Sequence, residues 1–75
     1  MHERVKRLSG NDLISALGRL GFKKVRQRGS HVVMKSSMDA TVGCVIPVHR
    51  ELAPGTLRGI LKQACISVEE LLKVL

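Results

Sequence analysis

The sequence predicts an α+β fold in which a three-stranded antiparallel sheet carries helices on one face, in the element order α-β-β-β-α-α. Three observations support this prediction. Apolar residues recur at helical spacing within residues 9–21, short β-type runs separated by turn residues follow in residues 22–47, and helical spacing returns after Pro54. Packing helices and sheet in two layers lets both bury their apolar faces.

The first helix should begin after Ser9, whose hydroxyl can cap it, while Asp12 adds negative charge to the first turn. Its apolar stripe consists of Leu13, Ile14, Leu17 and Leu20. Gly21 stands where a helix of this length ends in a left-handed residue. We expect residues 1–8 to form a flexible basic tail.

The middle of the chain predicts three strands, at residues 22–27, 30–35 and 41–46. The dipeptide Arg28-Gly29 should form the first turn, because glycine accepts a positive φ, and residues 36–40 form a longer connection. Pro47 ends the third strand because it has no N–H to donate to a ladder. The sheet is then an antiparallel meander.

Antiparallel pairing across the second connection predicts that opposed residues have numbers summing to about 76 to 78. His31 then lies opposite residues 45–47, and His49 emerges near Gly29. The run Val32-Val33-Met34 does not alternate between apolar and polar, so the sequence leaves open which face of the sheet carries His31.

Two helices should complete the fold. Pro54 and Gly55 open the first of them, whose apolar face consists of Leu57, Ile60, Leu61 and Ala64. Arg58 and Lys62 share the other side of this helix, where their like charges repel each other in water. A bound phosphate would make this pairing of charges favourable. The alternative interpretation is a solvated helix face without a ligand. Residues 67–70, Ser-Val-Glu-Glu, form a capping box that starts the last helix.

Length and composition limit the possible functions. With 75 residues, of which 44% are hydrophobic and 25% charged, residues 1–75 should form one folded domain with no room for a separate substrate domain. Two cysteines outside any Cys-x-x-Cys pair fit a reducing compartment. No apolar run suits a membrane span or signal peptide, so we expect a cytoplasmic protein that does not bind membranes.

Positive charge is concentrated in the middle of the chain. The net charge is +7, and between Arg19 and Arg50 seven basic residues stand against the single acid Asp39, which leaves 7 − 1 = +6 in that stretch. A phosphate-rich partner complements this charge, although a basic surface also serves solubility alone. With one Phe and no Tyr or Trp, the chain lacks an aromatic platform for stacking bases, so recognition must rest on charge and hydrogen bonds.

The hexapeptide Arg26-Gln27-Arg28-Gly29-Ser30-His31 places a histidine beside basic side chains after a glycine turn. Imidazole has an unperturbed pKa near neutrality, and guanidinium groups bind phosphate well, so a phosphodiester here would meet a proton acceptor. A histidine on a plain strand surface is the alternative. His31, Cys44 and His49 match no zinc spacing, and we expect neither a metal nor a small-molecule cofactor.

The element order is shared with double-stranded RNA-binding domains, which read helix shape, 2′-hydroxyls and phosphates. Beyond that order, four segments resemble the HicA toxins of bacterial and archaeal toxin–antitoxin pairs: Leu20-Gly21-Phe22, the hexapeptide ending at His31, Pro47-Val48-His49, and residues 52–64, Leu-Ala-Pro-Gly-Thr-Leu-Arg-Gly-Ile-Leu-Lys-Gln-Ala. The resemblance covers about residues 9–75.

This resemblance implies a domain of the double-stranded RNA-binding type, ribosome-independent cleavage of mRNA, and neutralisation by a HicB-like antitoxin. It also implies an essential histidine after Gly-Ser, which corresponds to His31. The sequence departs mildly from the family pattern at two places. Cys65 occupies a position often held by glycine, and the turn at residues 36–41 lacks the usual Pro-Asp-Gly character.

We therefore predict an endoribonuclease in which His31 removes the proton of the RNA 2′-hydroxyl without a metal, while His49 or water is the candidate acid. The residues expected to bind RNA are Lys24, Arg26, Arg28, Gly29, Ser30, Lys35, Arg58 and Lys62. Two alternatives remain open: a basic RNA-binding module without catalysis, and a scaffold that docks only a protein.

Overall fold

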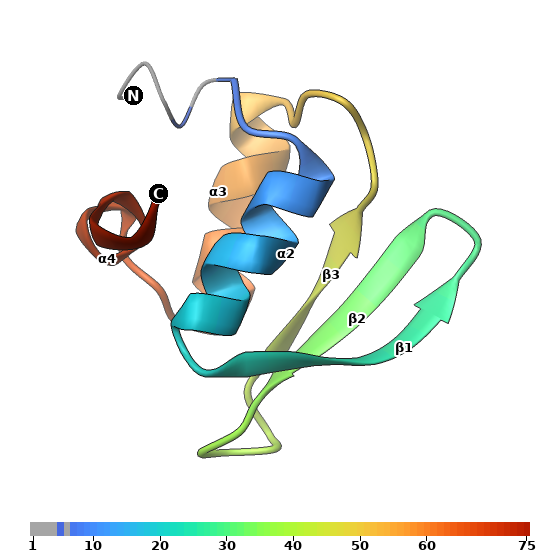
Figure 1. Ribbon diagram of the computed structural model, residues 1–75, viewed down its shortest axis with the longest axis vertical. Coiled ribbons are helices and arrows are strands. Elements are labelled where there is room, and N and C mark those ends of the chain that lie inside the picture. The colour runs from blue at the N-terminus through green and yellow to red at the C-terminus, as the bar shows by residue number, and fades with distance from the viewer. Residues whose placement is uncertain (1–4, 6) are drawn as a thin grey trace.

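The computed structural model describes Val5 and residues 7–75, and it has the predicted element order (Figure 1). The elements are α2 (Gly10–Arg19), β1 (Phe22–Arg28), β2 (His31–Ser36), β3 (Gly43–Pro47), α3 (Pro54–Ala64) and α4 (Val68–Val74). The three strands form one antiparallel sheet in the order β1-β2-β3. The α+β prediction is thus confirmed.

Capping boxes start α2 and α4, as the sequence predicts. The Ser9 hydroxyl accepts a hydrogen bond from the Asp12 N–H at 3.0 Å, and the Asp12 carboxylate accepts one from the Ser9 N–H at 3.3 Å. Ser67 and Glu70 make the same reciprocal pair at 3.1 and 3.0 Å. Each box satisfies two backbone donors that a helix start otherwise leaves unpaired.

Left-handed residues follow α2 and α3. Gly21 has a φ of 92°, whereas the residue that caps α3 is Cys65, with φ 57° and ψ 38°. The Cys65 N–H donates to the carbonyl oxygen of Lys62 at 3.2 Å, which turns the chain toward α4. A side chain with a Cβ is strained in this conformation, so α3 ends at a small energetic cost that glycine would avoid.

The hydrophobic core lies between the sheet and the helices α2 and α3, and Figure 1 shows these helices between the sheet and α4. Alternate residues of β2 and β3 face this core, namely Val32, Met34, Cys44 and Ile46. In β1 only Phe22 is buried. The outer part of the β1–β2 hairpin therefore extends past the helices.

The strand boundaries differ from the sequence prediction by one or two residues. Arg28 pairs with His31, so the first turn consists of Gly29 and Ser30, β1 is one residue longer than expected, and β2 begins and ends one residue later. β3 includes Pro47 as its last residue. β3 begins at Gly43 because the Asp39 carboxylate accepts hydrogen bonds from the N–H and the hydroxyl of Thr41, at 3.0 and 2.6 Å, and keeps Thr41 in the turn.

Residues 1–4 and 6 of the expected N-terminal tail lie outside the described residues. Val5 and Leu8 belong to the core, with exposures of 0% and 5%, and the Leu8 carbonyl oxygen accepts a hydrogen bond from the Leu52 N–H at 2.8 Å. The sequence did not indicate this packing, because two apolar residues among charged neighbours show no helical stripe.

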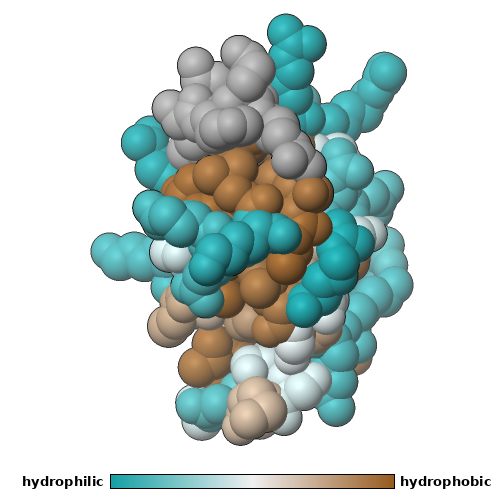
Figure 2. Space-filling view, turned by 60° about the vertical axis from the view of Figure 1, so that its left-hand side comes forward, coloured by the Kyte–Doolittle hydropathy of each residue, from teal (hydrophilic) through white to brown (hydrophobic). Residues whose placement is uncertain are grey.

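The side of the molecule that carries α4 has an apolar area with hydrophilic residues on both sides (Figure 2). Ile14 of α2 and Leu72 and Leu75 at the C-terminal end are half-buried and pack against the core. No helix within the described residues is long and apolar enough to cross a membrane.

Candidate nucleic-acid interface

His31 is the first residue of β2, and it lies on the face of the sheet that the helices leave open. Its neighbours Val32 and Met34 are each only 2% exposed and face the helices. Since successive side chains of a strand point to opposite faces, His31, Val33 and Lys35 face the other way. The structure thereby answers the question of sheet face that the sequence left open.

The turn before His31 is held from two sides. Gly29 has a φ of 57°, which permits the tight reversal, and its carbonyl oxygen accepts a hydrogen bond from the Gln27 side-chain amide at 3.0 Å. The Ser30 carbonyl oxygen accepts one from the Val48 N–H at 2.7 Å. The backbone of Gly29 and Ser30 thus fixes the position at which His31 enters the sheet.

Cross-strand pairing groups the residues of the open face into rows, because opposed residues of an antiparallel ladder project from the same face. We define the open face by these three rows: Arg28, His31 and Pro47; Arg26, Val33 and Val45; Lys23, Lys35 and Gly43. The predicted opposition of His31 to residues 45–47 is confirmed at Pro47.

A β-bulge in β1 decides which cations reach this face. Lys24 pairs with Met34 and Arg26 pairs with Val33, so Val25 is left without a partner of its own. Met34 faces the helices, which puts Lys24 on the helix side, where its ammonium donates to the Gln27 side-chain oxygen at 2.8 Å. The structure brings Arg26 and Arg28 to the face of His31 and leaves Lys24 on the opposite one.

The open face is strongly cationic. The sequences of the three strands contain no Asp or Glu. Lys23 and Lys35 are direct ladder partners, and opposed like charges destabilise a sheet unless an anion lies between or beside them. Lys23 was not among the RNA-binding residues predicted from the sequence, although alternation with the buried Phe22 is a signal that places it on the open face.

Within the part of the chain that the structure describes, neither the His31 ring nor the guanidinium groups of Arg26 and Arg28 form a hydrogen bond. All three residues are exposed. The Lys35 ammonium donates to the Ala40 carbonyl oxygen at 3.3 Å. The His31 ring and the two guanidinium groups therefore have no hydrogen-bond partner among the described residues and are accessible to a ligand.

His49 follows β3 and is held by its backbone. Its N–H donates to the Pro47 carbonyl oxygen at 2.9 Å, and its own carbonyl oxygen accepts from the Gly10 N–H at 2.9 Å. The bond from Val48 to Ser30 brings this segment beside the first turn, as the register predicts. The side chain of His49 is exposed, and no hydrogen bond to His31 appears among the described residues.

Arg58 and Lys62 are exposed residues of α3, in the helix layer. The open face belongs to the other side of the sheet, so the structure does not place these two cations beside His31. Any RNA that contacts both groups has to pass around an edge of the sheet.

The described residues contain no group of three or more His, Cys, Asp and Glu side chains placed to hold a metal ion. Cys44 pairs with Met34 and faces the core, and burial raises the pKa of its thiol to about 11. This thiol is therefore protonated near neutral pH, and it lies on the face opposite to His31.

Together, the fold and the open face define a small α+β protein with an exposed histidine in a cationic sheet surface. The family model described as the HicA toxin of bacterial toxin–antitoxin pairs matches residues 10–66, so the chain belongs to the HicA toxin family. It is thus a toxin of a toxin–antitoxin system and has an antitoxin as its counterpart. A search of curated proteins found no match.

Proposed function

We propose that this toxin is an endoribonuclease that cleaves mRNA independently of the ribosome, with His31 as the general base. One observation carries the proposal: an exposed imidazole stands in the same cross-strand row as Arg28, on a face whose strands contain no acidic residue. A polyanion with a hydroxyl beside each phosphate is the ligand that such a surface favours.

The proposed reaction uses the RNA itself as nucleophile. The imidazole of His31 takes the proton of a ribose 2′-hydroxyl, the 2′-oxygen bonds to the neighbouring phosphorus, and the bond to the 5′-oxygen breaks. The products are a 2′,3′-cyclic phosphate and a 5′-hydroxyl, which takes up a proton. General-base catalysis of this kind contributes roughly 10²- to 10⁴-fold in rate.

Arg26 and Arg28 bind the scissile phosphate in this proposal and stabilise the charge that develops on it. A guanidinium group suits this role because its planar donors match two phosphate oxygens at once. Lys23 and Lys35 form the third row and bind the next phosphates along the strand. The backbone of Gly29 and Ser30 lines the approach to His31.

The 5′-oxygen needs a proton as it leaves, and His49 or a water molecule supplies it. His49 is supported by its place beside the first turn, where backbone bonds to Gly10 and Pro47 anchor it. Lys24, Arg58 and Lys62 contact outlying phosphates instead of the scissile one. No step requires a metal, and we place the protein in the cytoplasm, where mRNA is found.

We further propose that a HicB-like antitoxin neutralises the toxin by covering His31 and the open face. An acidic surface on the partner complements the cations there. Saturating antitoxin should then protect His31 from modification by diethyl pyrocarbonate, and unchanged labelling of His31 in the complex contradicts this mode of inhibition.

A comparison of His31→Ala with His49→Ala tests the nuclease. His31→Ala should abolish cleavage of a single-stranded RNA while it keeps RNA affinity and the melting temperature, because the side chain is exposed. His49→Ala should retain part of the activity if water can replace the acid. The parent protein should leave 2′,3′-cyclic phosphate ends and should not cleave a substrate with 2′-deoxyribose at the scissile position. It should keep its activity in the presence of EDTA.

Cleavage by His31→Ala at the parental rate, or loss of the parental activity in EDTA, contradicts the mechanism. The non-catalytic RNA-binding module makes a different prediction, namely protection of RNA by the parent protein with no new ends. Gel electrophoresis of end-labelled RNA distinguishes the two functions.

A further inference from the structure

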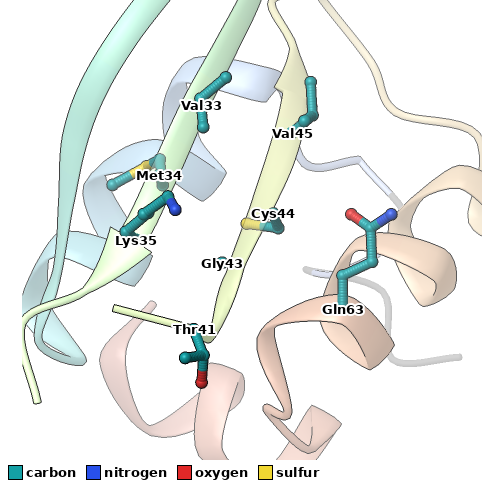
Figure 3. A pocket seen from close by; sticks show the side chains of 8 residues that line it. All are labelled: Val33, Met34, Lys35, Thr41, Gly43, Cys44, Val45 and Gln63. Atoms are coloured by element: carbon teal, nitrogen blue, oxygen red, sulfur yellow. The ribbon is translucent and has the colours of Figure 1, made fainter. Parts of the chain in front are cut away.

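A hollow of about 400 Å³ opens on the sheet beside β3, one row away from His31. Its lining includes Val33 and Lys35 of β2, Gly43 and Val45 of β3, Thr41 before β3, and Gln63 of α3. Figure 3 shows Val33 and Val45 on neighbouring strands and the Gln63 side chain extending from α3 alongside β3.

The lining of the hollow is mostly apolar. Val33 and Val45 form one cross-strand pair, and Val45 remains 43% exposed. Gly43 allows β3 to approach β2 closely beside the hollow. A Cβ there would lie 2.6 Å from the Met34 carbonyl oxygen and 3.2 Å from the Lys35 Cγ, so residue 43 has no room for a side chain. A flat ring can pack against the two valines at this place.

Polar groups of both kinds stand around these apolar walls. The Gln63 amide offers two donors and one acceptor, and it has no hydrogen-bond partner among the described residues. The Thr41 hydroxyl is already bonded to Asp39 at 2.6 Å, and the Lys35 ammonium lies 3.3 Å from the Ala40 carbonyl oxygen. Apolar walls with a few convergent polar groups are typical of sites for small planar ligands.

The hollow lies at the β3 edge of the sheet, where the open face meets the helix layer, because Val33 and Val45 line it from the open face and Cys44 and Gln63 line it from the helix side. Val33 follows His31 by two residues on the same side of β2, which is about 7 Å at ~3.3 Å per residue. Lys35 lies a further two residues along. An RNA strand whose scissile phosphate meets His31 and Arg28 would therefore bring an adjacent nucleotide over Val33 and Val45.

Resting on the proposed function, we propose that this hollow seats one unpaired base of the RNA next to the cleavage site, and that the Gln63 amide reads its hydrogen-bonding edge. The hollow makes the enzyme select single-stranded RNA, because a base inside a helix is stacked and cannot enter it. The valines supply apolar contact where other RNA-binding proteins use aromatic rings.

Cleavage of a randomised single-stranded RNA, with the new ends sequenced, tests the base site. The parent should prefer particular bases at one position near the cut. Gln63→Ala should reduce that preference roughly fivefold to tenfold, as expected for lost hydrogen bonds, with no fall in melting temperature. Thr56→Ala, an exposed substitution in the same helix outside the hollow, should leave the preference unchanged.

An unaltered base preference in Gln63→Ala overturns the proposal, as does an equal loss of preference in Thr56→Ala.

A second measurement distinguishes failure of the base site from failure of the proposed nuclease. His31→Ala, which should bind without cutting, is titrated with short oligoribonucleotides that carry one abasic position. Affinity should fall at one position only, and Gln63→Ala in this background should make that fall smaller, because the contact with the valines remains. A uniform response to all abasic positions contradicts the base site whatever the catalytic outcome.

Discussion

Lys24 and Arg26 lie on opposite faces of the sheet although a single residue separates them on β1. In a regular strand, residues two apart share a face, and the bulge at Val25 reverses this relationship. Arg26 thereby joins Arg28 and His31, while Lys24 bonds to Gln27 on the helix side. The irregularity in β1 thus determines the composition of the candidate site.

This division of the cations gives a direct prediction. Arg26→Ala and Arg28→Ala should each lower kcat/KM for RNA cleavage by roughly 10- to 100-fold, because each removes a charge-assisted contact to the phosphate. Lys24→Ala should lower it by less than about threefold, since an outlying phosphate contact is solvent-screened. Steady-state kinetics at one fixed salt concentration measure all three. Equal losses of kcat/KM in the three variants would show that the catalytic contribution of these cations does not depend on the face of the sheet that they occupy.

Gly10 supports the segment that follows β3. A Cβ on Gly10 would overlap the Pro47 carbonyl oxygen and lie 2.9 Å from the Val48 Cα, both of which are backbone atoms that cannot rotate away. Gly10→Ala should therefore lower the free energy of unfolding by about 2–3 kcal/mol. Urea denaturation measures this change.

Gly18→Ala is the matched control for that variant. It makes the same substitution in the same helix, and nothing lies within 4 Å of the new Cβ, so it should raise stability by about 0.5–1 kcal/mol through helix propensity. If Gly10→Ala were as stable as Gly18→Ala, the close approach of α2 to the end of β3 would be refuted.

Cys65 adopts a left-handed conformation at the end of α3, with its side chain exposed. Cys65→Gly should raise the free energy of unfolding by about 1 kcal/mol, because glycine removes the steric cost at positive φ and little packing is lost. Cys65→Ala keeps a Cβ and should give no such gain. Thermal denaturation of the two variants in parallel distinguishes backbone strain from a simple effect of losing the thiol.

Cys44 predicts a loss of stability at alkaline pH. Burial raises the pKa of its thiol from 9.0 to about 11, so between these values the folded state keeps a proton that the unfolded state releases. The contribution of the buried, protonated thiol to the free energy of unfolding is complete below about pH 9 and declines as pH rises toward 11. Unfolding free energies measured from pH 7 to 11 should fall more steeply in the parent than in Cys44→Ala. Parallel curves for the two proteins would contradict this assignment.

The sequence was sufficient to predict the order of the elements, because each carries its own local signal. Ser9 and Ser67 mark helix starts, Gly21 follows a helix end, and Pro47 ends a strand. The register at His31 and Pro47 was also predictable, since the length of the connection before β3 limits how the two strands can pair. The buried positions of Val5 and Leu8 carried no such signal.

By itself, then, the sequence determined which elements form, where most of them end and where positive charge accumulates, since capping, turn formation and net charge depend on residues close together in the chain. Only the tertiary structure decided which side chains share a face. The bulge at Val25 depends on how β1 pairs with β2, and the contact of Gly10 with Pro47 depends on how α2 packs on the sheet. Both depend on contacts between separate segments of the chain. The bulge puts Lys24 and Arg26 on opposite faces, and the helix contact holds the segment after β3 in place, and neither has a signal in the local sequence pattern.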